Sequence, residues 1–275
     1  MQLTVSQLEE KAFNIRKDLL KLSSIESIHI GGDLSSTDLM TVLWQYQIKY
    51  NPSNPKDEDR DRFILSKSHA SAVMCFNQAE IGCFDKEKIF NTYAKDESMF
   101  SMHSCNLINP FVEVSTGSLG HGFPIACGIA QALKLKNNTK SKVYVFMGDG
   151  EQAEGSIWEA AMNASKMKLN NIIAIIDNNN MGADGLLSKY SCVNNLEDKY
   201  KAFGWETYVI DGNNISKIVE TFDSINSKKQ TKPIVIIGRT IKGKGVSFME
   251  NNPKWHAGKI SKEEYEIALG DIENE

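Results

Sequence analysis

The segments KVYVFMGDGE at positions 142–151 and NIIAIIDNNNMG at positions 171–182 each join a short apolar run to a polar cluster. The apolar runs, 142–147 and 171–176, have the length and β-branched composition of buried strands. Between them, about 153–169, apolar residues recur at helical spacing. A strand, a helix and a second strand in this order predict a parallel β-sheet covered by helices.

The same alternation continues toward the end of the chain. Further helices are predicted near 196–203 and 215–225, and further strands at 206–210 and 233–238. Strands that are apolar at every position are typical of a sheet buried on both faces. The predicted fold class is therefore α/β, with a mostly parallel sheet covered by helices on both faces.

The first half of the chain is predicted to be mainly helical. A helix is expected over 6–22, and another over 37–50 with Ser36 as its N-cap and Asn51-Pro52 after its end. The stretch Gly31-Gly32-Asp33 has the composition of a loop. Other predicted elements are helices at 68–80 and 119–136 and a loop at 101–122.

No linker or internal repeat divides the chain. We therefore expect one domain over residues 1–275, with a helical front half over about 1–140 and strand–helix alternation over about 141–240. A short acidic tail is expected after Leu269-Gly270.

Composition excludes several classes of protein. The 31 Lys and Arg residues against 35 Asp and Glu give a net charge of −4, without the basic footprint of a nucleic-acid-binding protein. No apolar run approaches the roughly 18 residues of a membrane helix, and the polar N-terminus has no signal-peptide core. The cysteines include no CxxC pair, which predicts reduced thiols in a cytoplasmic protein: Cys75, Cys83, Cys105, Cys127 and Cys192.

Polar residues that follow neighbouring parallel strands meet at one edge of the sheet. Asp149 and Asn179 are 30 positions apart, enough for one strand–helix–strand unit. Their oxygens suit Mg²⁺ completed by phosphates and water, and the helix start after Asp149 suits an anion. The residues alone therefore predict a magnesium–diphosphate site, with a tight glycine turn beside an Asn-rich loop as the alternative.

The run from Gly148-Asp149-Gly150 to Asn178-Asn179 resembles the thiamine diphosphate motif, which opens with GDG and closes with NN. The sequence EGSIWEA at 154–160 narrows the resemblance to the transketolase family. Further matches, which extend the resemblance over about 7–270, are HIGG with Leu34-Ser35 at 29–35, LSKSHA at 65–70, TGSLGHG at 116–122, KGKG at 242–245 and Trp255-His256.

The resemblance implies cofactors and site residues. Mg²⁺, or another divalent cation such as Ca²⁺ or Mn²⁺, would be bound by the side chains of Asp149 and Asn179 and by the backbone carbonyl of Met181. Thiamine diphosphate would contact His69, Gly117, Ser118, Leu119, Gly148, Asp149, Gly150, Glu151, Asn179, Lys244 and His256. Catalytic roles would belong to His29, His69, His103, His256 and Glu154, the last through proton relay between sites.

The histidines also fit proton transfer without the resemblance, because imidazole titrates near neutral pH. Each histidine taken alone could be an ordinary loop residue. All five lie in Gly/Ser-rich or Trp-flanked segments, which indicates a shared cleft: His29, His69, His103, His121 and His256.

The resemblance covers the first of the three domains of a complete transketolase. It implies an N-terminal subunit that transfers a two-carbon ketol unit from a ketose (phosphate) to an aldose. Activity would require a C-terminal partner subunit of similar size that carries the pyrimidine-binding domain, in an α2β2 heterotetramer.

The sequence departs from the family pattern beside the histidines, at Ile28, Ser68, Met102 and Ser104. Glycine is common at the first three positions and proline at the last. These departures predict an unusual ketose, either branched such as apulose phosphate or sulfonated such as 6-deoxy-6-sulfofructose. The alternatives are a deoxyxylulose phosphate synthase fragment, part of a 2-oxo acid dehydrogenase, or a non-catalytic cofactor-binding module.

Overall fold

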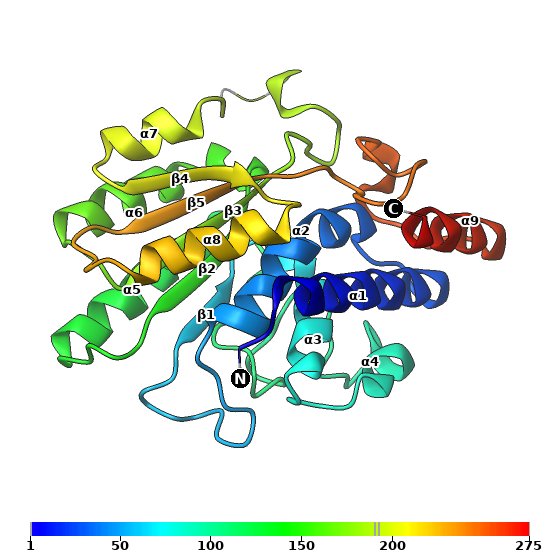
Figure 1. Ribbon diagram of the computed structural model, residues 1–275, viewed down its shortest axis with the longest axis horizontal. Helices are drawn as coiled ribbons and strands as arrows, with labels where there is room; N and C mark the ends of the chain where they lie inside the picture. The colour runs from blue at the N-terminus through cyan, green and yellow to red at the C-terminus, as the bar shows by residue number, and fades with distance from the viewer. Residues whose placement is uncertain (1, 190, 192, 275) are drawn as a thin grey trace.

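A sheet of five parallel strands forms the centre of the molecule (Figure 1). The computed structural model describes residues 2–189, 191 and 193–274. The strand order is β1-β2-β3-β5-β4, and every neighbouring pair is parallel, so the predicted α/β class is confirmed. The strands are β1 (Arg62–Leu65), β2 (Val143–Gly148), β3 (Ile172–Asn178), β4 (Glu206–Asp211) and β5 (Ile234–Arg239).

Helices cover both faces of this sheet. Tyr144 and Phe146 of β2 pack in one apolar cluster, and Val145 and Met147 pack in another, because alternate side chains of a strand point to opposite faces. The first cluster includes residues of α1 (Val5–Ile25), α2 (Ile30–Val42), α3 (Ser71–Glu80), α4 (Glu87–Thr92), α8 (Ile215–Asn226) and α9 (Lys262–Glu273). The second includes residues of α5 (Gly122–Leu135), α6 (Gly155–Lys166) and α7 (Leu196–Ala202).

Helix α2 begins at Ile30, so the loop predicted at Gly31-Gly32-Asp33 and the N-cap predicted at Ser36 are both wrong. All of its residues are buried, and this burial outweighs the low helix propensity of glycine and serine. A Cβ on Gly31 would lie 2.4 Å from the carbonyl oxygen of Trp255. The glycine therefore permits close packing inside a helix. The helix also ends early, and Leu43–Gln47 form a π-helical turn.

The front half contains more than helices. The segment 62–65 forms β1 at the edge of the sheet, although its sequence was not predicted to be a strand. Helix α9 replaces the tail expected after Gly270, and a capping box of Ser261 with Glu264 starts it. The S-x-x-E pattern of a capping box is visible in the sequence, so the start of this helix could have been predicted from it.

Cys75 and Cys127 are buried, Cys83 and Cys105 are half-buried, and all four are free thiols. Cys192 lies outside the described residues. Within the described part of the chain, no helix combines the length and apolar character needed to cross a membrane.

We expect Gly31→Ala to lower the free energy of unfolding by about 1–3 kcal/mol, because the added methyl group collides with backbone rather than with a flexible side chain. Gly270→Ala in α9 is the matched control. A Cβ there meets no heavy atom within 4 Å, so the stability should rise by about 0.5–1 kcal/mol. Urea unfolding of the full chain measures both, and equal stabilities of the two variants would contradict the packing argument.

Candidate active site

The polar clusters at the ends of β2 and β3 meet at one edge of the sheet. Gly148 is paired with Asp177 in the ladder between these strands. Oδ2 of Asp149 accepts hydrogen bonds from the backbone N–H of Asn180 and, at 3.4 Å, from Nδ2 of Asn178. The two segments are therefore joined directly, at the carboxyl edge where parallel sheets bind ligands.

Asp149 and Asn179 offer oxygen ligands here, and they are only 4% and 6% exposed. Burial, together with the neighbouring Asp177 carboxylate, raises the pKa of Asp149 to about 7, so a cation would stabilise its charged form. Oδ1 of Asn179 accepts a hydrogen bond from the N–H of Met181 at 3.0 Å. The described residues contain no group of three or more His, Cys, Asp or Glu arranged for a metal ion. A cation here would need oxygens from a bound ligand, as Mg²⁺ with phosphates has.

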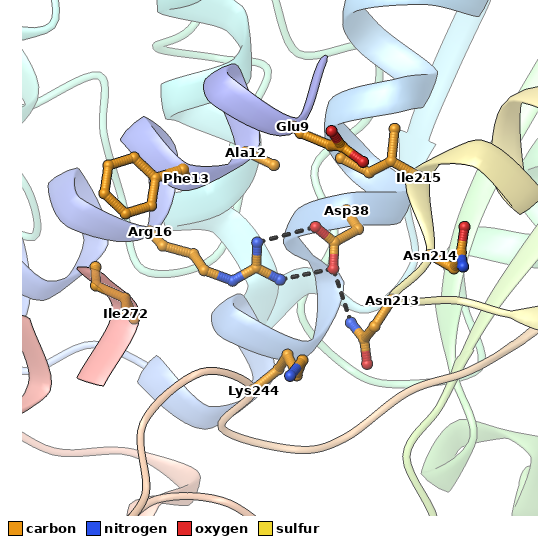
Figure 2. A pocket seen from close by; sticks show the side chains of 10 residues that line it. All are labelled: Glu9, Ala12, Phe13, Arg16, Asp38, Asn213, Asn214, Ile215, Lys244 and Ile272. Atoms are coloured by element: carbon orange, nitrogen blue, oxygen red, sulfur yellow. Dashed lines mark hydrogen bonds and ion pairs between the residues drawn. The ribbon is translucent and has the colours of Figure 1, made fainter. Parts of the chain in front are cut away.

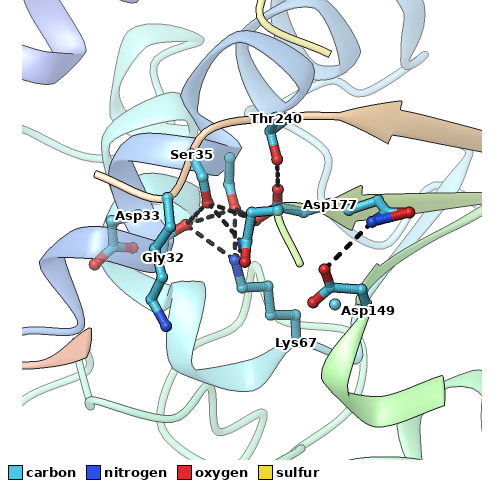
Figure 3. A network of polar contacts seen from close by, with 12 residues as sticks. Gly32, Asp33, Ser35, Lys67, Asp149, Asp177 and Thr240 are labelled. Atoms are coloured by element: carbon cyan, nitrogen blue, oxygen red, sulfur yellow. Dashed lines mark hydrogen bonds and ion pairs between the residues drawn. The ribbon is translucent and has the colours of Figure 1, made fainter. Parts of the chain in front are cut away.

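A buried ion pair, Lys67 with Asp177, lies next to this edge (Figure 3). Nζ of Lys67 also donates to the carbonyl oxygen of Gly32 and to Oγ of Ser36, each at 3.0 Å. Burial by itself would raise the pKa of Asp177, but Lys67 and several hydrogen bonds hold it below its ordinary value. The other donors to this carboxylate are the side chains of Ser35, Ser36, Asn179 and Thr240.

Lys67 and Asp177 are not among the site residues predicted from the sequence. Asp177 follows the five apolar residues of β3 and is the last but one residue of that strand, and a charge at such a buried position requires a partner. That rule predicts a buried cation near Asp177. It does not identify Lys67, which is distant in the sequence.

Four histidines from separate segments surround one space. The ring centroid of His29 lies 5.2 Å from that of His69, 5.4 Å from His256 and 5.8 Å from His103. Burial, together with nearby positive charges, lowers the pKa of His29 and of His256 to about 4 and that of His69 well below its ordinary value. These three rings are therefore neutral at pH 7, and each can donate one hydrogen bond and accept another.

The histidines and the acidic edge share a cavity of about 240 Å³, which Lys67 and Lys242 also line. Nζ of Lys242 lies 2.8 Å from Nδ1 of His256, and burial lowers the pKa of Lys242 to about 8. Basic groups and the oxygens of Asp149 and Asn179 thus line one cavity. The predicted site residues that line it are His29, His69, His103, Gly117, Leu119, Gly148, Asp149, Gly150, Glu151, Asn179, Met181 and His256.

Lys244 lies elsewhere, in a separate cavity of about 400 Å³ that contains the Arg16–Asp38 ion pair (Figure 2). The chain turns at Gly243, whose φ is +76° and whose missing Cβ would lie 2.5 Å from the carbonyl oxygen of Met249. Because of this turn, the lysine that faces the histidines is Lys242. The sequence motif alone gives no means to choose between the two lysines.

Ser118, Glu154 and His121 also lie outside the cavity lining. Glu154 is exposed, and a Cβ on Gly120 would lie 2.6 Å from the Cβ of Glu154. His121 is exposed at the N-terminus of α5, with Nδ1 3.3 Å from the carbonyl oxygen of Ser118. The shared cleft therefore contains four of the five histidines.

Glu151 lines the cavity, but its carboxylate is occupied by this chain's own donors. It accepts hydrogen bonds from Oγ of Ser66 at 2.6 Å, from the N–H of Gly120 at 3.1 Å and from the N–H of Gly148 at 2.9 Å. Burial raises its pKa. Glu151 thus joins the end of β1 to the start of α5 and the end of β2.

Comparison with known proteins finds relatives along nearly the whole chain. Residues 14–269 match the family model described as transketolase, thiamine diphosphate binding domain. One subunit of the apulose-4-phosphate transketolase of Phocaeicola vulgatus is 38% identical over 269 residues, which are 98% of this chain and 94% of that protein. The 6-deoxy-6-sulfo-D-fructose transketolase subunit SqwG of Clostridium sp. strain MSTE9 is 36% identical over 269 residues, 98% of this chain and 97% of that protein.

Solved structures agree with these sequence matches. The crystal structure of transketolase from Campylobacter jejuni has a TM-score of 0.88 at 30% identity, and the match covers 99% of this chain and 43% of that one. The chain thus spans about two fifths of the length of the solved transketolases that it matches.

We expect Lys67→Met to destabilise the chain by about 3–5 kcal/mol, because it leaves the Asp177 carboxylate buried without its partner. Adding Asp177→Asn should recover part of this loss, since the amide carries no charge. Lys140→Met, which breaks an exposed ion pair with Asp59, is the control and should change stability little. Urea unfolding measures all three, and a Lys67→Met variant as stable as the control would disprove the role of the pair.

Proposed function

The chain belongs to the transketolase family, and from that premise we propose that it is the thiamine diphosphate-binding subunit of a two-chain transketolase. In this function, a two-carbon ketol unit passes from a ketose (phosphate) donor to an aldose acceptor. The observation that carries the proposal is the cavity in which Asp149 and Asn179 face Lys242 and the histidines. It combines cation ligands and anion-binding groups in one place.

The residues present fit thiamine diphosphate with Mg²⁺. Asp149 and Asn179 would hold the cation through their side-chain oxygens, and Met181 through its backbone carbonyl. Ca²⁺ or Mn²⁺ would suit the same oxygens. The raised pKa of Asp149 supports this assignment, because that carboxyl lacks a cation among its neighbours strong enough to keep it fully ionised.

The diphosphate would lie against the basic wall of the cavity, in contact with Lys242, His69, His256 and the N–H of Gly150. A Cβ on Gly117 would meet no heavy atom within 4 Å, so the backbone there is open to close approach by a ligand. Leu119 lines the same wall. The bound cofactor supplies the carbon nucleophile and electron sink that ketol transfer requires.

The histidines would hold and move protons on the sugar. Because His29 and His69 are neutral at pH 7, each can accept a proton from a hydroxyl at one nitrogen and donate at the other. His103, which lines the cavity and is exposed, would contact the sugar as it enters. Glu154 is exposed, and a role for it in proton relay would require a partner subunit to cover it.

We propose that the partner is a C-terminal transketolase subunit with the pyrimidine-binding domain, in an α2β2 heterotetramer. Relatives that match over nearly their full length are named as transketolase subunits, whereas solved transketolases are more than twice as long as the match. The free thiols Cys75 and Cys127 support a cytoplasmic location.

A branched or sulfonated ketose is the second candidate for the donor. The names of two relatives include apulose-4-phosphate and 6-deoxy-6-sulfo-D-fructose. In this chain, Ile28 is fully buried and its backbone pairs with Gly258, while Ser68 and Ser104 form hydrogen bonds beside His69 and His103. The departures from the family pattern at these positions do not involve Asp149 or Asn179. They therefore favour a different sugar substrate with the same cofactor.

We expect the chain, purified gently from its host with Mg²⁺ and thiamine diphosphate, to retain the cofactor and a second subunit in native mass spectrometry. The complex should transfer a ketol unit from at least one of xylulose 5-phosphate, apulose 4-phosphate and 6-deoxy-6-sulfofructose. Asp149→Ala should weaken cofactor retention by about 100-fold or more, and Asp184→Ala, at a nearby exposed carboxylate, should not. A lone chain without cofactor would favour the non-catalytic binding module instead.

We expect the complex to release protons when it binds the cofactor at low pH and to take up protons when it binds the cofactor at high pH. At about pH 6.5, Asp149 is largely protonated because its pKa is about 7, so an arriving cation releases a proton. At about pH 8.5, Lys242 is mostly neutral because its pKa is about 8, so an arriving diphosphate makes it take up a proton. Titration calorimetry in two buffers of different ionisation enthalpy measures the proton count. Proton release at both pH values, or proton uptake at both, would contradict this prediction.

A further inference from the structure

Three segments that contribute residues to the cavity lining meet at Thr116. They are the segment 66–69 that follows β1 and carries His69, the segment 101–104 that carries His103, and the segment 116–119. Oγ of Ser68 donates to the carbonyl oxygen of Thr116 at 2.8 Å, and Oγ of Ser104 lies 3.1 Å from Oγ1 of Thr116. Oγ1 of Thr116 in turn donates to the carbonyl oxygen of Leu65 at 2.6 Å.

The backbone continues this connection. The N–H of Thr116 donates to the carbonyl oxygen of Ser104 at 3.1 Å. Ser68 is 0% and Ser104 4% exposed, so their hydroxyls cannot exchange these partners freely for bulk water. Thr116 thus contacts all three segments, with both its backbone and its side chain.

The position of His103 depends on these contacts, because its segment has no regular secondary structure. Its ring packs against that of His29, with centroids 5.8 Å apart. On the other side of His103, Oγ of Ser71 donates to the carbonyl oxygen of Ser101 at 2.8 Å. Hydroxyl groups therefore hold the segment on both sides of the histidine.

We propose that Ser68, Ser104 and Thr116 form a hydroxyl clasp whose role is to position His103 against the sugar substrate. The three are positioning residues, since they act through His103 and His69 and leave the cation ligands alone. The inference rests on the proposed function, because it assigns the clasp to that reaction's sugar. It also accounts for two departures from the family pattern, Ser68 and Ser104, which are coupled here through one threonine.

Thr116→Val tests the clasp, because valine keeps the branched shape and removes the hydroxyl. Ser104→Ala removes the other half of the same contact, and Thr116→Ser restores a hydroxyl. Ser115→Ala is the matched control, since the Ser115 hydroxyl bonds to Asn106 on the outer side of the same loop. Each variant is prepared as the full chain and in the complex with its partner.

The first measurement is NMR of isotope-labelled histidine side chains in the full chain. The imidazole resonance of His103 should shift or broaden in Thr116→Val and in Ser104→Ala, and it should return toward the wild-type position in Thr116→Ser. The resonance of His256, which the clasp does not contact, should stay in place. Unchanged His103 resonances in Thr116→Val and Ser104→Ala would overturn the proposal, whatever the enzyme's activity.

The second measurement is steady-state kinetics of the assembled enzyme with its best ketose donor. Thr116→Val and Ser104→Ala should each raise KM about fivefold to tenfold, with kcat within about twofold and cofactor retention unchanged. The double variant should be no worse than Thr116→Val, because Thr116→Val already removes the contact that Ser104→Ala breaks, together with the bond to Leu65. Losses confined to kcat, or shared by Ser115→Ala, would also overturn it. An inactive wild-type complex would refute the proposed function and leave the NMR result to decide the clasp.

Discussion

The buried ion pair between Lys67 and Asp177 is the interaction on which the arrangement of the site depends. Either charge alone would be costly at these buried positions, so the two segments must meet. His69 lies two residues after Lys67, and Asn179 lies two residues after Asp177. Through Gly32 and Ser36, the same lysine also fixes the start of α2, which His29 directly precedes. One ammonium group thus sets the relative positions of His29, His69 and Asn179.

Burial keeps the groups around the cavity in their less charged forms. Burial and nearby positive charge keep His29 and His256 neutral at pH 7. The pKa of Asp149 is raised to about 7, so this carboxyl is close to half-protonated at pH 7. Burial lowers the pKa of Lys242 to about 8. An anion alone would leave the Asp149 carboxylate without a positive charge beside it. A cation alone would leave the Lys242 ammonium group without a negative charge beside it. A diphosphate together with a divalent cation compensates both sides at once, which is the electrostatic reason that this pair of ligands suits the cavity.

The central strands β2, β3 and β5 were predictable because they are buried on both faces and almost entirely apolar, whereas β4 is a half-buried edge strand. The ends of the predicted strands differ from those of β2 to β5 by at most two residues. The meeting of Asp149 with the Asn178–Asn180 cluster followed from parallel strand ends. Helix α2 was not predictable in this way, because a helix buried on all sides has no amphipathic period and its glycines resemble a loop. The choice of Lys242 over Lys244 depends on the turn at Gly243, which no local pattern specifies.

The two sides of the cavity are held by different kinds of interaction. The edge with Asp149 and Asn179 is set by strand register and a buried ion pair, neither of which tolerates a small change. The side with His103 is set by hydroxyl contacts that Ser68 and Ser104 make to Thr116, outside the hydrogen-bonded ladders of the sheet. We therefore expect a substitution at Ser104 to act on the side that carries His103, whereas Ser68 also adjoins His69, which we place beside the diphosphate. A fold divided in this way can change its sugar while it keeps its cofactor, because the two requirements fall on separate sets of contacts.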